Sequence, residues 1–268
     1  MSCNTLIILA AGASSRMKQS LENSEDFKGK ALLPLGKEQK PVIYYLLQNV
    51  QKAGYTEVVL VVGKEADAFK TYLHNNPVSG LKFSFAYQRI PEGRHKPLGT
   101  ADAVFQAMVQ LPELHQKVFA VCNSDNLYSV NALQLLREEA FSNAFISYDR
   151  DGLDFPVERI RSFALLVQNE LGILQNLIEK PSETVAESYK DNHGTLRVSM
   201  NLWKLNGKEA YPFLRDCPLH PTRGEKELPN TVLTMAQAGI PFRGISVKEH
   251  VPDLTSKEDI EIIAKYLK

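Results

Sequence analysis

Short apolar runs alternate with amphipathic segments through the first half of this chain. Residues Leu6–Leu9, Glu57–Gly63 and Lys117–Cys122 form runs that are rich in β-branched and other apolar side chains. Between them, residues 41–54 and the segment that begins near Thr100 place apolar side chains at helical spacing. Buried strands that alternate with helices are typical of a parallel sheet with helices on both faces. The first 150 residues therefore predict a Rossmann-like α/β fold with a mixed, mainly parallel sheet.

The pattern changes after about Arg150, where predicted strands follow one another directly. Residues 162–168, 173–180 and 196–205 are expected to be strands, and antiparallel pairing suits strands that are joined without a helix. Two helices, a last strand at 242–247 and a C-terminal helix follow. We expect a single domain over residues 1–268, made of three parts, residues 1–150, 151–250 and 251–268.

The composition argues against several classes of protein. The 268 residues carry 31 basic and 31 acidic side chains, so the formal net charge is zero and nucleic acid is not an expected partner. No apolar stretch approaches the roughly 20 residues of a membrane-spanning helix, so no membrane association is expected. Cys3, Cys122 and Cys217 are scattered without a CxxC pair, which predicts a reducing compartment and a cytoplasmic location.

Six small residues separate the first apolar run from Arg16, in the stretch LIILAAGASSRM. A row of small residues lets backbone N–H groups approach a ligand closely, and a helix N-terminus after such a turn favours an anion. The chain has no GxGxxG, GxxxxGK[ST], HExxH or GxSxG motif, which argues against dinucleotide binding, a P-loop, a zinc protease and a triad hydrolase. The turn, Arg16 and Lys30 together favour phosphate binding.

Aspartates follow two of the predicted strands. Asp125 lies in NSDN after Lys117–Cys122, and Asp253 lies in VPDLT after residues 242–247. Ligands of parallel α/β sheets bind beyond the carboxyl ends of the strands, where one or two carboxylates can hold magnesium against phosphate oxygens. In the alternative interpretation, Asp125 is the N-cap of the next helix and Asp253 is a turn or capping residue.

Seven segments resemble, in order, the signatures of the sugar-phosphate nucleotidyltransferases, the pyrophosphorylases that make nucleoside-diphosphate sugars. They are LAAGASSRM, KALLPLGKEQKPVIYYLL, GTADAV, NSDN, EKPS, VSMNLW and VPDLTSKEDI, and they cover nearly the entire chain. The opening LAAGxSxRM alone is also similar to enzymes that transfer CMP to methylerythritol phosphate or GMP to molybdopterin.

The resemblance implies a fold and a reaction. The fold would be that of nucleotidyltransferases, which is similar to GT-A, with a nucleotide-binding half at 1–150, a small β-rich sugar-binding subdomain at 151–250 and a metal-site loop and helix at 251–268. The reaction would condense a nucleoside triphosphate with a sugar 1-phosphate, giving a nucleoside-diphosphate sugar and pyrophosphate, with Mg²⁺ as cofactor. Uridine or thymidine triphosphate is favoured, and cytidine triphosphate stays open.

The same resemblance implies roles for individual residues. The implied nucleotide-binding residues are Ala10, Ala11, Gly12, Ala13, Ser14, Ser15, Arg16, Gln88, Gly99 and Thr100. The implied sugar-phosphate-binding residues are Glu179, Lys180 and Asn201, and the implied metal ligands are Asp125 and Asp253. The implied catalytic residues are Arg16, Lys30, Asp125 and Lys180. In the ordinary alternative, Glu179 and Lys180 are an exposed ion pair and Asn201 is a buried polar group with satisfied hydrogen bonds.

The chain departs from the family between Gln88 and Gly99, where RIPEGRHKPL is longer than usual. Arg94, His95 and Lys96 of this insertion either contact phosphate or form a solvated bulge. Two other functions stay open for the whole chain. One is a cytidylyltransferase that acts on an alditol, inositol or other non-sugar phosphate. The other is a catalytically silent protein that binds nucleotide or sugar phosphate and regulates a partner. The sequence does not predict the oligomeric state.

Overall fold

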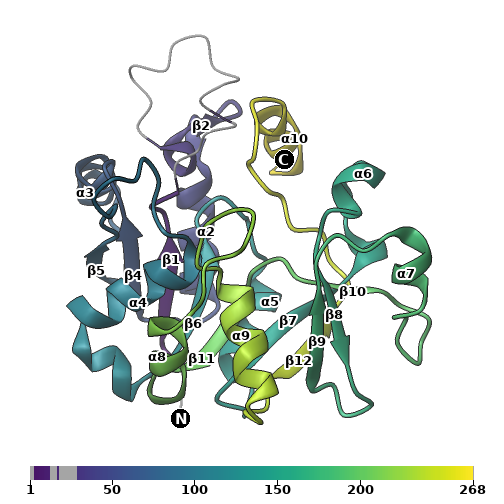
Figure 1. The fold of residues 1–268 in the computed structure, drawn as a ribbon. Coiled ribbons are helices and arrows are strands. Elements are labelled where there is room, and N and C mark those ends of the chain that lie inside the picture. The colour runs from purple at the N-terminus through teal and green to yellow at the C-terminus, as the bar shows by residue number, and fades with distance from the viewer. Residues whose placement is uncertain (1–2, 13–16, 18–28, 268) are drawn as a thin grey trace.

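The computed structural model describes residues 3–12, 17 and 29–267 of the chain (Figure 1). The strands of this part are β1 (Thr5–Leu9), β2 (Pro34–Leu35), β3 (Lys40–Pro41), β4 (Glu57–Val62), β5 (Lys82–Tyr87), β6 (Val118–Asn123), β7 (Ala144–Asp149), β8 (Leu165–Gln168), β9 (Leu174–Ile178), β10 (Arg197–Val198), β11 (Trp203–Asn206) and β12 (Arg243–Val247). The α-helices are α2 (Val42–Lys52), α3 (Ala66–Asn75), α4 (Thr100–Gln110), α5 (Val130–Glu138), α6 (Val157–Ile160), α7 (Glu183–Glu187), α8 (Gly207–Arg215), α9 (Leu228–Gln237) and α10 (Glu258–Tyr266). Short 3₁₀ helices are η1 (Lys30–Leu32), η2 (Pro112–Gln116) and η3 (Arg150–Gly152).

A ten-stranded sheet forms the centre of the molecule. Its strand order is β5-β4-β1-β6-β11-β7-β10-β8-β9, and β12 pairs with β7. Strands β5, β4, β1 and β6 are parallel neighbours, and β12 is parallel to β7, whereas β8, β9, β10 and β11 pair with antiparallel neighbours. The predicted mixed α/β sheet, with antiparallel pairing in the second half, is therefore confirmed.

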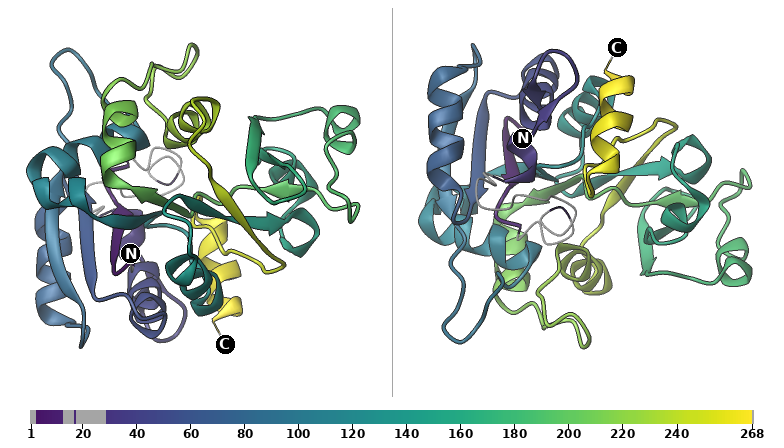
Figure 2. Two further views of the ribbon diagram at one scale, coloured as in Figure 1. Left: turned by 90° about the horizontal axis from the view of Figure 1, so that it is seen from below. Right: turned by 90° about the horizontal axis from the view of Figure 1, so that it is seen from above.

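Helices cover both faces of the sheet (Figure 2). On β1, Leu6 and Ile8 belong to a buried cluster with residues of α2, α3 and α5, whereas Ile7 belongs to a second cluster with residues of α4, α8 and α9. Successive side chains of a strand point to opposite faces, so a continuously apolar strand is buried on both sides. This is why the apolar runs of the first half predict central strands.

The predicted strand over residues 196–205 is wrong, because the structure divides it into β10 and β11. Strand β10 pairs with β7 and β8, whereas β11 pairs with β6 and β7, so the chain changes partners at residues 199–202. Asn201 in this break has a φ of 56°, a left-handed conformation that cannot continue a strand. Among the residues that the structure describes, no helix combines the length and the apolar character that crossing a membrane requires.

Candidate active site

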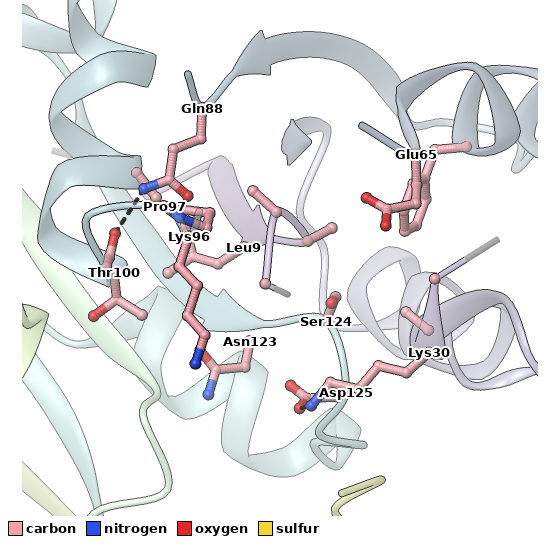
Figure 3. A pocket seen from close by; sticks show the side chains of 18 of the residues that line it. Leu9, Lys30, Glu65, Gln88, Lys96, Pro97, Thr100, Asn123, Ser124 and Asp125 are labelled. Carbon is pink, nitrogen blue, oxygen red and sulfur yellow. Dashed lines mark hydrogen bonds and ion pairs between the residues drawn. The ribbon is translucent and has the colours of Figure 1, made fainter. Parts of the chain in front are cut away.

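A cavity of about 250 Å³ lies at the carboxyl ends of β1, β5 and β6. Lys30 and Asp125 lie together on one side of it, and Gln88 and Thr100 lie on the opposite side (Figure 3). These side chains come from elements far apart in the sequence, which the parallel strands bring to one edge of the sheet. Ligands of open α/β sheets bind at this edge, so the cavity is our candidate active site.

The turn after β1 forms part of the cavity wall. Ala10, Ala11 and Gly12 line the cavity, and the N–H of Ala10 donates to the carbonyl of Val61 at 2.8 Å. Small side chains keep this part of the wall open to a ligand. The other residues of the predicted phosphate turn lie outside the described residues, and they are Ala13, Ser14, Ser15 and Arg16.

Lys30 and Asp125 form an ion pair in the cavity. Lys30 begins η1, and Asp125 lies in the loop after β6. Only 22% and 15% of their side-chain surfaces are exposed, so each charge depends on the other in the absence of a ligand. The N-cap of α5 is Ser129, whose side chain accepts a hydrogen bond from the N–H of Ala132. The capping alternative for Asp125 is therefore wrong.

Asp253 lies beside Asp125 because their two loops pair through the backbone. Asn126 and Asp253 form an isolated antiparallel bridge, and the N–H of Leu254 donates to the carbonyl of Asp125 at 2.9 Å. Burial, and then the negative charge of Asp125, raise the pKa of Asp253, while nearby cations act in the opposite direction. Carboxylate oxygens are the ligands that Mg²⁺ prefers, so these two residues fit a magnesium site.

Arg159 holds Asp253 in place. Its Nη2 donates to Oδ2 of Asp253 at 2.7 Å and to the carbonyl of the same residue at 3.0 Å, and its Nη1 donates to Oδ1 of Asp259 at 2.7 Å. The hydroxyl of Thr255 donates to the same Oδ2 at 3.0 Å. In the described part of the chain, Oδ1 of Asp253 accepts no hydrogen bond, so it is the oxygen left for a cation. The role of Arg159 was not predicted from the sequence.

Gln88 joins the end of β5 to the start of α4. Its Nε2 donates to the carbonyl of Gly99 at 2.8 Å and to Oδ2 of Asp102 at 2.9 Å. The hydroxyl of Thr100 accepts a hydrogen bond from the N–H of Leu228 at 2.9 Å, which ties α4 to α9. Gln88, Gly99 and Thr100, which the family resemblance implies bind the nucleotide, are thus brought together on one wall of the cavity.

Gly99 permits a close approach between two segments of this wall. It has a φ of +109°, and a Cβ at this position would lie 2.5 Å from the carbonyl oxygen of Lys226. Gly99→Ala is expected to lower the free energy of unfolding by about 2–4 kcal/mol, because it adds a steric overlap to an unfavourable backbone conformation. Denaturation with urea measures this change.

Gly80 provides the control for this prediction. Its φ of +81° is also positive, but a Cβ there would have no neighbour within 4 Å. Gly80→Ala therefore introduces the backbone strain without the overlap, and we expect a cost of about 1 kcal/mol. Equal losses of stability in the two variants would contradict the close approach at Gly99.

Part of the insertion between Gln88 and Gly99 borders the cavity, although His95 and Lys96 are exposed. Lys96 lines the cavity, and its side chain extends along it toward Asn123 (Figure 3). Arg94 has a structural role, because its Nη2 donates to the carbonyl of Gly224 at 2.8 Å. His95 lines a second cavity of about 390 Å³, which adjoins the first and shares Gln88 with it.

Glu179 follows β9 and does not line the candidate active-site cavity. Nη2 of Arg223 donates to its two carboxylate oxygens at 2.9 and 2.7 Å, and Arg223 also pairs with Glu227. Ligand atoms of Glu179, His220 and Glu227 lie within 4.8 Å of one another. Because Arg223 already pairs with both carboxylates of this cluster, its geometry favours an ion-pair network over a metal site.

The segment between α8 and α9 connects Glu179 with the cavity. Arg223 of this segment holds Glu179, and two residues later Glu225 lines the cavity. The N–H of Lys226 then donates to the carbonyl of Leu98 at 2.5 Å, which joins the segment to the insertion. The predicted sugar-side residue and the predicted nucleotide wall are therefore linked by one stretch of chain.

Lys180 and Asn201 share an uncommon backbone conformation. Their φ values are 45° and 56°, which cost about 1–3 kcal/mol in residues other than glycine. Neither residue lines the candidate active-site cavity. Asn201 lies near the loop that carries Asp125, because the hydroxyl of Tyr128 donates to the carbonyl of the preceding residue, Met200, at 2.7 Å and lies 3.4 Å from that of Asn201. Lys180 is exposed.

The chain is similar in sequence to curated proteins of two staphylococci. The chain is 24% identical over 234 residues to the bifunctional protein GlmU of Staphylococcus epidermidis and 26% identical over 238 residues to that of Staphylococcus haemolyticus. Each match covers 87% of this chain and 45% or 46% of the relative, so the chain spans about half the length of these curated relatives.

A solved structure shares the fold over nearly the whole chain. It is described as UDP-glucose pyrophosphorylase complexed with UDP-glucose, and it superposes with a TM-score of 0.74 at 16% sequence identity. The match covers 99% of this chain and 98% of the other, which confirms the predicted fold class. The family model described as Nucleotidyl transferase matches residues 5–204, a span that contains Lys30, Gln88 and Asp125. The chain therefore belongs to the nucleotidyl transferase family.

Proposed function

We propose that this chain condenses a nucleoside triphosphate with a sugar 1-phosphate and releases pyrophosphate. The observation that carries the proposal is the ion pair of Lys30 and Asp125 beside Asp253, at one side of a cavity at the sheet edge. Gln88 and Thr100 form the opposite side, where a base and ribose would bind. Membership of the family supports nucleotidyl transfer, and the names of the relatives and of the solved structure support a sugar phosphate as acceptor.

The reaction needs positive charge and alignment more than proton transfer. An oxygen of the sugar phosphate attacks the α-phosphorus, the bond from that phosphorus to the β-bridging oxygen breaks, and pyrophosphate leaves with the bonding electrons. Lys30 would neutralise charge at the α-phosphate, and Arg16 is proposed to do so at the leaving pyrophosphate. The backbone of Ala10, Ala11 and Gly12 would face the base, and residues 13–16 would wrap the triphosphate.

Magnesium is the proposed cofactor. Asp125 and Oδ1 of Asp253 would hold the ion, which when bound neutralises phosphate charge. Arg159 would keep Asp253 in the orientation that presents this oxygen, because it holds Oδ2. Lys30 pairs with Asp125 in the absence of ligand and would turn to the phosphate when the nucleotide binds.

The sugar phosphate is proposed to bind on the side of the second half of the sheet. Glu179 would accept hydrogen bonds from sugar hydroxyls, Lys180 would contact the phosphate, and Asn201 would help to recognise the sugar. The contact of Asn201 with the loop of Asp125 supports its position near the reacting groups. For Glu179, the proposal requires that Arg223 gives up part of its present contact.

A pyrophosphate-release assay tests the proposal. The four ribonucleoside triphosphates and thymidine triphosphate would each be combined with a panel of sugar 1-phosphates, with and without Mg²⁺. We expect magnesium-dependent release with at least one pair. Release with alditol or inositol phosphates alone would instead identify a cytidylyltransferase of that type, and tight binding without release would identify a silent regulator.

For the nucleotide we propose uridine or thymidine triphosphate, which the UDP-glucose in the similar solved structure supports. We also propose a cytoplasmic location. Cys3, Cys122 and Cys217 are buried and unpaired, which supports a reducing compartment.

A further inference from the structure

Gln88 offers the cavity a hydrogen-bond acceptor and no donor. Its amide contacts the carbonyl of Gly99 and the carboxylate of Asp102, at 2.8 and 2.9 Å. Both partners are acceptors, so the atom that faces them must be the NH₂ group. Figure 3 shows this nitrogen directed toward the start of α4, near Thr100, while the amide oxygen points away from it.

The amide oxygen of Gln88 lacks a partner although the residue is buried. Gln88 is 7% exposed and lines both adjoining cavities. In the part of the chain that the structure describes, Oε1 accepts no hydrogen bond. Because Gln88 lines the cavity, its Oε1 is open there to a ligand that supplies an N–H.

Asp102 fixes this arrangement from behind the wall. It lies in the first turn of α4, is 5% exposed, and is absent from the lining of either cavity. Its Oδ2 also accepts a hydrogen bond from Nε2 of Gln106 at 2.7 Å. Oε1 of Gln106 in turn accepts from the backbone N–H of Arg89 at 2.8 Å, so Asp102 is held by a network that includes the start of the insertion.

We propose that Asp102 is a positioning residue that determines which base the cavity accepts. This inference rests on the proposed function and on its uridine or thymidine nucleotide. In those nucleosides N3–H is the sole N–H of the base, so it is the group that Oε1 of Gln88 accepts from. Cytosine has a lone pair at N3, which the fixed oxygen repels, and its N–H donors lie on the 4-amino group, at a different place on the ring. The carboxylate of Asp102 prevents the Gln88 amide from turning over to accommodate it.

Asp102→Asn tests the inference. An asparagine can donate to Gln88 as well as accept from it, so the orientation of the Gln88 amide is then held by the carbonyl of Gly99 alone and becomes easier to reverse. The ratio of kcat/KM for UTP to that for CTP is expected to exceed about tenfold in the wild-type protein, and to fall by about tenfold in Asp102→Asn. Calorimetric titration of UTP, dTTP and CTP in the presence of Mg²⁺ should show the same change in relative affinity.

Two further variants make the test independent of a folding defect. Gln88→Met removes the acceptor and leaves Asp102 paired with Gln106, so it should also reduce the preference for UTP. Asp67→Asn changes an exposed aspartate at the corresponding first turn of α3, and should leave the ratio unchanged. A merely structural role for Asp102 would lower turnover with all triphosphates equally and preserve the ratio.

Each contrary outcome overturns a distinct claim. A wild-type protein that prefers CTP, or a ratio that neither Asp102→Asn nor Gln88→Met alters, overturns this inference while pyrophosphate release still supports the proposed function. A wild-type protein that binds no triphosphate and releases no pyrophosphate with any acceptor overturns both.

Discussion

Replacement of Asp125 by asparagine is expected to lower magnesium-dependent pyrophosphate release by about 10³-fold or more. The amide keeps the size of the side chain but removes the negative charge that would hold the metal beside Asp253. The loss of several kcal/mol of charge stabilisation in the transition state accounts for this magnitude. Initial rates over a range of Mg²⁺ concentrations measure the effect, and titration of Mn²⁺ by electron paramagnetic resonance measures metal affinity separately.

Asp151→Asn is the control for this variant, because Asp151 is an exposed aspartate of η3 that does not line the cavity. It should retain wild-type rates. Circular dichroism should show that Asp125→Asn remains folded, since Ser129 and not Asp125 caps α5. Turnover near the wild-type level in a folded Asp125→Asn protein would remove this residue from the proposed site.

Lys30→Met is expected to reduce kcat by about 10²–10³-fold and to raise the KM for the triphosphate. Methionine retains much of the aliphatic packing of lysine but cannot neutralise a phosphate. The variant has a second expected effect of the opposite sign. Because Lys30 pairs with Asp125 when no ligand is bound, its removal should increase the affinity of the protein for Mg²⁺ or Mn²⁺ in the absence of nucleotide.

Lys37 offers a matched control, since it is an exposed lysine seven positions later that lies outside the cavity lining. Lys37→Met should change neither turnover nor metal affinity. The idea that Lys30 exchanges partners would be abandoned if Lys30→Met bound metal more weakly than the wild-type protein while nucleotide was absent.

The central strands could be predicted because their signal is local. The runs at β1, β4 and β6 are continuously apolar apart from one polar residue at an end of each strand, which is typical of strands buried on both faces. The break between β10 and β11 has no such signal. There the chain exchanges one strand partner for another, and residues 199–202 alternate polar and apolar side chains as a continuous strand can.

The candidate site was predicted in part by the same local logic. Lys30, Asp125 and Asp253 follow from strand ends and from the family resemblance, and the structure places the three together. Arg159 has neither kind of signal. It meets Asp253 across 94 positions of the sequence, and nothing in its own short helix distinguishes it from an exposed arginine.

The contact of Asp102 with Gln88 could not be predicted from the sequence either. It belongs to GTADAV, a segment that already carries the resemblance, yet the sequence does not indicate that its carboxylate faces Gln88 instead of solvent. A polar side chain gains its role from the atom opposite to it, and that atom comes from another element of the fold.

The sequence by itself predicted the alternation of strands and helices in the first half of the chain, the sheet edge that carries the candidate site, and the family. The pattern of apolar residues that predicts a strand or a helix extends over only a few positions. It can therefore be recognised without knowing which elements pack against each other. Only the tertiary structure decided the ion pair of Lys30 with Asp125, the hold of Arg159 on Asp253 and the orientation of Gln88. Hydrogen bonds and ion pairs depend on distances of about 3 Å between atoms of distant segments, and no local pattern encodes those distances.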